Sequence, residues 1–198
     1  MQLDQSLSQS LSRWNLLDSA FYQAWSAGEL PVDALATYAH EYGAFITTIA
    51  DGWAAHGDDA VAAEEREHVE LWRAFAKSLG TDIGAASTPA VAELVEVARR
   101  SFSDPVASLG ALYAFEAQQP ATSASKLEGL RAHYDLGAEA EVYFDVHKDD
   151  LDEPALLLER MRALPAVDQE RAAAACEQTA RALRLALDGL YAGCVAQA

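Results

Sequence analysis

The sequence predicts an all-α fold in a single domain that spans residues 1–198. Hydrophobic residues make up 51% of the chain, and alanine and leucine are abundant while glycine and proline are sparse. Such a composition favours packed helices over sheets and over disorder. Apolar residues recur at helical spacing, and we see no alternating strand pattern, internal repeat or linker. The length of 198 residues suits one domain with a sizeable core.

The first four predicted helices are marked by their ends. Residues 13–30 repeat apolar side chains at helical spacing and end near a glycine. A proline opens residues 31–57, and a glycine closes them. An aspartate N-cap opens residues 58–80, which again end at a glycine. A Thr-Pro pair begins the helix predicted at residues 87–102.

The second half of the chain continues in the same way. Residues 104–134 form a long segment that Pro120 should kink or break. Residues 138–150 follow, and an early proline opens residues 152–164. The final segment, 167–194, is amphipathic with an alanine- and leucine-rich face. Together these segments predict a bundle of about seven or eight helices.

Charge and motifs exclude several classes of function. Acidic residues outnumber basic ones by 31 to 14, giving a net charge of -17, so nucleic acid is not an expected partner. The plain interpretation of this charge is solubility. The sequence contains no Ser-His-Asp order, glycine-rich phosphate loop or Cys-x-x-Cys motif. Hydrolase, nucleotide-binding and thioredoxin-like functions therefore have no support.

The sequence also predicts a cytoplasmic protein. The first twelve residues lack a basic region and a long apolar core, and no apolar run approaches the ~18 residues of a membrane span. Cys176 and Cys194 both fall in the last predicted helix. They are roughly 27 Å apart along a straight helix, so they cannot pair with each other there. We expect free thiols in a reducing compartment, with no membrane partner.

The stretch "EEREHVELW", residues 64–72, can be interpreted in two ways. Glu64 and Glu65 lie four and three residues before His68, so all three share a helix face. A carboxylate and an imidazole on neighbouring turns can bind one metal ion. The alternative is the solvated face of an acidic helix that contains a chance histidine. The pair alone favours the second interpretation.

Two further places strengthen the metal-site hypothesis. Glu116 has a strongly apolar surrounding, where a carboxylate must be paired, protonated or metal-bound. His147 has apolar neighbours on one side, and Asp150 follows it by one turn. Each could instead be a hydrogen-bonded core residue. Three helices that each present an inward carboxylate or imidazole can build a metal centre, and these ligands suit iron or manganese more than structural zinc.

Four blocks carry a resemblance to a known family. These are "AFYQAWSAGELPVDALATYAHEY", "EHVELWRAFAKSLG", "LGALYAFEAQQPATSASKLEGLRAHY" and "YFDVHKDDLDEPA". In this order they resemble blocks of the CADD-like proteins, which are haem-oxygenase-like dimetal oxidases related in fold to TenA and PqqC. The resemblance covers residues 19–155. It implies a haem-oxygenase-like bundle of about seven helices, with two iron ions, or iron and manganese, that activate O2.

The resemblance places metal ligands at His68, Glu116 and His147. The family's usual first-helix carboxylate lies seven residues before the histidine, where this chain has Val61. Glu64 or Glu65 could substitute for it, since both lie on the His68 face and some relatives use a Glu-x-x-His pair.

The third block departs further from the family. Its pattern is His-x3-Asp-x2-His, and this chain keeps His147 but has Leu151 and Pro154 at the other two positions. Asp150 or Asp152 could supply a carboxylate if the helix is distorted. No histidine follows His147, so the second histidine has no local replacement. A single-metal site, or a weakly held second metal, follows more easily than a six-ligand centre.

One branch of the family makes para-aminobenzoate from its own side chains. The resemblance places its sacrificial tyrosine at Tyr22 and its amino-donor lysine at Lys126. Tyr38 and Tyr143 match aromatic residues that line the site of that branch. The plain alternative for each tyrosine is core packing with one hydrogen bond.

Three hypotheses of function follow. The leading one is a cytoplasmic, non-haem iron (or iron/manganese) oxidase or oxygenase that uses O2 on a small metabolite. The second is a para-aminobenzoate synthase that consumes its own tyrosine. The third is a metal-free member that binds a small ligand in a degenerate site. The resemblance also leads us to expect a homodimer.

Overall fold

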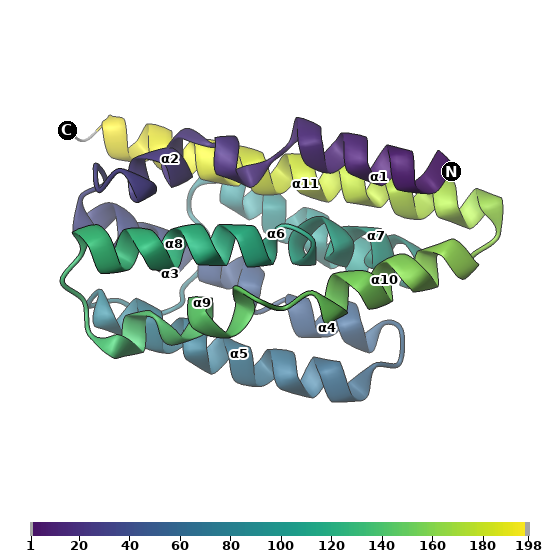
Figure 1. Ribbon diagram of the computed structural model, residues 1–198, viewed down its shortest axis with the longest axis horizontal. Helices are drawn as coiled ribbons and strands as arrows, with labels where there is room; N and C mark the ends of the chain where they lie inside the picture. Colours follow the sequence, from purple (N-terminus) through teal and green to yellow (C-terminus); the bar gives the residue numbers. More distant parts are fainter. Residues whose placement is uncertain (1, 197–198) are drawn as a thin grey trace.

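A computed structural model describes residues 2–196, which form α-helices, two short 3-10 helices (η1 and η2) and no strand. Long helices run along the bundle, and the start of α1 and the end of α11 lie at opposite ends of its long axis (Figure 1). The predicted all-α class is confirmed. The elements are α1 (Gln2–Arg13), η1 (Leu16–Asp18), α2 (Ala20–Ser26), α3 (Val32–Ile46), α4 (Ile49–Ala54), α5 (Asp59–Ser78), α6 (Pro89–Phe102), α7 (Pro105–Glu116), α8 (Gln119–His133), η2 (Ala138–Ala140), α9 (Val142–His147), α10 (Asp152–Ala163) and α11 (Ala166–Val195).

The helix α1 precedes the first predicted helix and was missed. Its sequence is polar, but Leu3 and Leu7 lie one turn apart and are buried, and Ser10 continues the same face. Just beyond it, Trp14 donates a 2.8 Å hydrogen bond from Nε1 to Oε1 of Glu177 on α11. Packing against α11 therefore stabilises this end of the chain, a tertiary effect that local propensity does not reveal.

Some predicted helices are divided, which raises the number of helices above seven or eight. The predicted break at Pro120 is confirmed, because α7 ends at Glu116 and α8 begins at Gln119. The second predicted helix is divided into α3 and α4 at Thr47 and Thr48. Both threonine hydroxyls donate to carbonyl oxygens three residues earlier, so they compete with the regular helix pattern.

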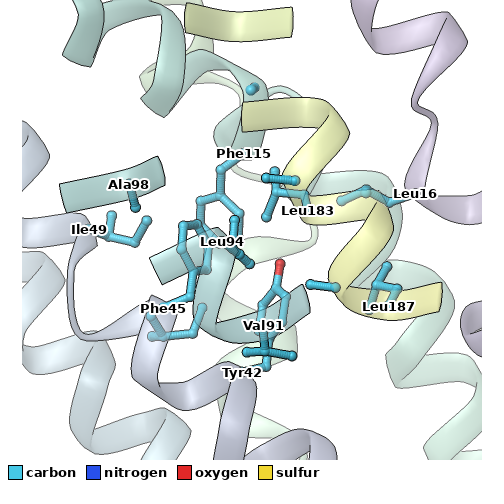
Figure 2. Close-up of a cluster of buried hydrophobic side chains, with 14 of the residues drawn as sticks. Leu16, Tyr42, Phe45, Ile49, Val91, Leu94, Ala98, Phe115, Leu183 and Leu187 are labelled. Atoms are coloured by element: carbon cyan, nitrogen blue, oxygen red, sulfur yellow. The ribbon is translucent and has the colours of Figure 1, made fainter. Parts of the chain in front are cut away.

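The core joins α3, α4, α6, α7 and α11, and Figure 2 shows the meeting side chains, which include Phe45, Ile49, Leu94, Phe115 and Leu183. Helices α7 and α11 approach each other unusually closely at Gly110. A Cβ atom there would lie 1.8 Å from the carbonyl oxygen of Ala172. Glycine is therefore required, and α7 is fixed firmly where it ends in Glu116.

The helix α10 is held by charged contacts at its C-terminal half. Arg160 forms a two-point ion pair with Asp58, which precedes α5, and Nη2 to Oδ1 measures 2.8 Å. Arg162 reaches Asp4 of α1, with Nη2 2.7 Å from Oδ2. These contacts fix the position of α10 in the bundle. The predicted ligand positions lie at the start of this helix and in the turn before it.

At 30 residues, α11 is the longest helix. Its sequence includes charged residues from the first turn onward, such as Asp168, Arg171 and Glu177. No helix within residues 2–196 combines the length and the apolar character that crossing a membrane requires.

Candidate metal centre

The helix α5 presents Glu65 and His68 to the interior. Its buried residues recur at intervals of three and four, and both side chains lie on this face with Ala62 and Trp72. Glu64 is exposed. The motif therefore contributes one inward carboxylate and one inward imidazole, with Nδ1 of His68 3.1 Å from Oε1 of Glu65. The buried face of the helix, with Glu65 and His68, matches the metal-site interpretation of "EEREHVELW". The exposed face, with Glu64, matches the solvated-helix interpretation.

His147, the last residue of α9, meets this pair from the other side of the site. Its Nε2 lies 3.2 Å from Nδ1 of His68. Its Nδ1 lies 2.6 Å from the carbonyl oxygen of Tyr143. A carbonyl can only accept, so Nδ1 carries the proton and the lone pair of Nε2 faces the other two residues. A backbone contact of this kind orients a metal-binding histidine.

The two histidines differ in their protonation. Burial lowers the pKa of His147 to about 4, so this imidazole is neutral at pH 7 and able to act as a ligand. Burial acts on His68 in the same direction, but the hydrogen bond and the negative charge of Glu65 outweigh it and raise its pKa. A metal ion would displace the proton that Glu65 otherwise stabilises on His68.

Glu116 is a carboxylate within the core, at the end of α7. Its side chain is 3% exposed, and its Oε1 atom has no hydrogen-bond partner among the described residues. Burial, followed by the charges of Glu153 and Glu65, raises its pKa well above the usual value. An unpartnered buried carboxyl oxygen calls for an explanation, and a cation is one that fits.

Glu153, in the first turn of α10, is the residue that the sequence did not indicate. A carboxylate oxygen from each of Glu153, Glu65 and Glu116 lies within 4.8 Å of the others. Burial and the charge of Glu65 raise the pKa of Glu153 to about 8. The helical spacing to Leu157 and Met161, both buried, is the signal that could have placed it on the inward face.

Asp150, a predicted ligand, occupies the turn before α10. It is half-buried, and its Oδ1 accepts a 3.2 Å hydrogen bond from the backbone N–H of Asp152. The two groups of closely spaced potential ligands do not include it. The structure thus brings four of the five predicted metal ligands together, and it places Asp150 at the edge of the site.

The residues present fit an iron centre. One ligand atom from each of Glu65, His68 and His147 lies within 4.8 Å of the others, and all three residues are buried. A carboxylate with two imidazoles is a ligand set that non-haem iron uses. Glu116, whose Oε1 has no hydrogen-bond partner among the described residues, adjoins this group, with a carboxylate oxygen within 4.8 Å of one of Glu65. These are the residues that would hold iron.

The second pair of predicted residues, Tyr22 and Lys126, also meets in the core. The Nζ atom of Lys126 lies 3.5 Å from the hydroxyl oxygens of both Tyr22 and Tyr38, which lie 3.0 Å from each other. All three side chains are buried. Burial lowers the pKa of Lys126 to about 7. An uncharged lysine amine is therefore available beside a pair of phenols near neutral pH.

Comparison with known proteins identifies the family. A model of the iron-containing redox enzymes matches residues 56–187. The chain therefore belongs to this family, and the predicted class of oxidoreductase is confirmed at that level. The match includes both histidines of the site, together with Glu65, Glu116 and Glu153.

Individual relatives have names that specify an activity. The chain is 31% identical over 167 residues to a 4-aminobenzoate synthase of Nitrosomonas europaea, covering 68% of this chain and 67% of that protein. It is 29% identical over 164 residues to a 4-aminobenzoate synthase of Chlamydia pneumoniae, covering 72% and 73%. Both matches span most of each protein.

Solved structures show the same fold at low identity. A domain of unknown function with a haem-oxygenase-like fold from Shewanella denitrificans superposes with a TM-score of 0.75 at 18% identity, covering 97% of this chain and 91% of that one. A CADD-like protein of unknown function from Nostoc punctiforme gives 0.70 at 16%, covering 99% and 96%. The fold is thus a single haem-oxygenase-like helical domain, as the resemblance implied.

Proposed function

We propose that the protein is a 4-aminobenzoate synthase that consumes its own side chains. Tyr22 supplies the ring, Lys126 supplies the nitrogen, and O2 is the co-substrate. The proposal narrows the family-level activity of an iron-containing redox enzyme. The relatives named 4-aminobenzoate synthase support it over the oxidation of a separate metabolite. Membership in this family also favours a metal-dependent protein over a metal-free ligand-binding one.

The placement of Lys126 is the observation that carries the proposal. A lysine 3% exposed destabilises a fold unless its charge is compensated, yet its amine contacts two phenol oxygens rather than a carboxylate. Apolar and aromatic rings surround it, with Nζ 4.8 Å from the ring centroid of Phe144. Packing alone gives no reason to bury an amine at this position. An amino donor for the ring of Tyr22, by contrast, has to lie beside that ring.

The surrounding residues can prepare the reacting pair. Tyr38 shares a hydrogen bond with the Tyr22 hydroxyl and so fixes the orientation of its ring. With a pKa of about 7, the Lys126 amine has a free electron pair in a large fraction of molecules at neutral pH. Phe21 and Trp25 pack beside these phenols and exclude water from the amine.

The metal site lies close to this cluster in the same core. When bound, iron supplies the redox chemistry with O2 that no amino-acid side chain can supply. Glu65, His68 and His147 are the residues that would hold it. Tyr143 and Trp72 lie between the two parts. The ring centroid of Tyr143 lies 4.3 Å from that of His147 and 4.8 Å from that of Trp72, which in turn lies 5.4 Å from the ring of Tyr38.

Isotope labelling tests the proposal directly. Protein made with ring-13C6 tyrosine is loaded with Fe(II), with or without Mn(II), and exposed to O2 and a reductant. We expect ring-labelled 4-aminobenzoate, at most one per chain, with a mass loss mapped to Tyr22. The Tyr22→Phe variant should give none, while Tyr191→Phe, at the far end of α11, should match the wild type. Product without the label, or labelled product from Tyr22→Phe, would overturn the assignment.

A further inference from the structure

The two positions at which the family pattern has ligands, one before α10 and one in its first turn, do not offer side-chain ligands here. Leu151 is 66% exposed, so it lies on the solvent side of the turn, and the side chain of Pro154 has no donor atom. Asp150 bonds within the turn to the Asp152 N–H. The metal centre would therefore lack a contribution from this part of the chain unless another residue supplies one.

The beginning of α10 provides the replacement. The helix starts at Asp152, and Glu153 precedes the buried Leu157 and Met161 by one and two turns. These three residues share one face because residues four apart are neighbours on a helix. Arg160 and Arg162 hold the helix to Asp58 and Asp4, so this face is fixed toward the core.

We propose that Glu153 takes the place of the missing histidine and forms, with Glu65 and Glu116, an all-carboxylate subsite for a second divalent cation. This inference rests on the metal centre of the proposed function but not on its product. One oxygen of each of the three side chains lies within 4.8 Å of the others. Glu65 also belongs to the histidine group, so the two subsites would lie side by side.

Two observations separate this cluster from an ordinary acidic surface. Glu65 and Glu116 are 4% and 3% exposed, and the Oε1 atom of Glu116 is buried without a hydrogen-bond partner among the described residues. The ion pairs within residues 2–196 also give none of the three carboxylates a lysine or arginine. Three carboxylates brought together in a core must either take up protons or be compensated by positive charge, and a divalent cation supplies that charge to all three at once.

The donor atoms determine which cation the subsite prefers. Oxygen-only ligands suit Mn2+ and other hard cations, whereas the imidazoles of His68 and His147 suit Fe2+. Each chain would thus bind two cations in unlike surroundings. The subsite of Glu153 is the one expected to accept Mn2+ more readily.

Metal stoichiometry tests this assignment without any turnover. Wild type, Glu153→Gln and the matched control Glu159→Gln, an exposed position on the same helix, are loaded anaerobically with Fe(II) and Mn(II). We expect two metals per chain in the wild type and the control, and one in Glu153→Gln. Mn(II) titration followed by electron paramagnetic resonance should show affinity at least about 10-fold weaker in Glu153→Gln. The Glu153→His variant should retain two metals.

Two results would overturn the inference. One is a Glu153→Gln protein that binds Mn(II) like the wild type, and the other is a wild type that binds a single metal. A thermal melt of each metal-free variant verifies that it is folded, and removal of one of three crowded carboxylates is expected to leave the melting temperature unchanged or higher. Loss of one metal in Glu153→Gln together with no 4-aminobenzoate from the wild type would retain this subsite and reject the proposed function instead.

Discussion

The Nδ1 atom of His147 lies 2.6 Å from the carbonyl oxygen of Tyr143, one turn earlier in α9. This hydrogen bond leaves Nε2 as the free electron-pair donor and directs it toward His68. A short helix of six residues thus sets both the tautomer and the direction of a candidate ligand. The metal-binding state of His147 is therefore prepared before any ion arrives.

Removal of His147 should therefore weaken iron binding. We expect His147→Ala to bind Fe(II) at least about 10-fold more weakly than the wild type, because one of three ligand groups is lost. Anaerobic titration with metal analysis measures the effect. The control is His133→Ala, which removes an exposed histidine that bonds only to the Ser26 carbonyl. Equal iron affinity in both variants would reject His147 as a ligand.

The buried amine predicts a pH dependence of the reaction. With a pKa of about 7, Lys126 is mostly protonated at pH 6 and mostly neutral at pH 8. The yield of 4-aminobenzoate in a fixed time should rise about 5- to 10-fold across this range, because only the neutral amine can donate its nitrogen. Mass spectrometry measures the product, and metal content is determined at each pH. A flat profile with constant metal content would contradict the role of Lys126.

The same amine predicts an effect on stability. The pKa of Lys126 falls from 10.5 in the unfolded chain to about 7 in the fold, so the unfolded chain binds more protons between these values. The contribution of Lys126 to the free energy of unfolding therefore rises with pH across this window and is lowest below pH 7. Lys126→Met should stabilise the protein at pH 6.5, and its advantage should shrink by about 2 kcal/mol at pH 8.5.

Urea unfolding of both proteins at the two pH values measures this difference. The Tyr191→Phe variant serves as a control whose stability relative to the wild type should not change with pH. An advantage of Lys126→Met that is independent of pH would mean that the amine stays charged in the fold, with its proton stabilised by the rings around it.

The close contact between α7 and α11 predicts that one methyl group added at Gly110 strongly destabilises the protein. Gly110→Ala would place a Cβ atom 1.8 Å from the Ala172 carbonyl oxygen, and backbone cannot move aside as a flexible side chain does. We expect a loss of roughly 3 kcal/mol or more, from overpacking between two central helices. Gly193→Ala, near the end of α11, meets no atom within 4 Å and should be neutral or slightly stabilising. Urea unfolding distinguishes the two.

Local signals in the sequence account for most of the fold. Prolines, glycines and helical periodicity predicted the helices, including the break at Pro120. They missed α1, whose only strong apolar anchors are Leu3 and Leu7, because its stability comes from contact with α11. They also could not show that the threonines between α3 and α4 divide one predicted helix.

The residue types of the candidate site could be predicted from the sequence, but the directions of the side chains could not. Glu116 and His147 stood out as polar groups in apolar segments, and His68 as an imidazole one turn after two glutamates. Their spacing alone could not show that Glu65, and not Glu64, points inward. The sequence did not indicate Glu153 because the family pattern has its ligands at positions on either side of it. The residue at which α10 begins determines which side chain of its first turn faces the core.

If Tyr22 is consumed as proposed, its packing has a consequence for the protein after the reaction. This ring is 3% exposed, lies 6.1 Å from Phe21 and is fixed by Tyr38. Its removal would leave a void comparable to that of a large-to-small core substitution, which destabilises a domain by roughly 3–5 kcal/mol. A spent chain would therefore melt at a lower temperature than a fresh one and be more readily degraded by proteases. Synthesis of the product would then mark the used protein for replacement.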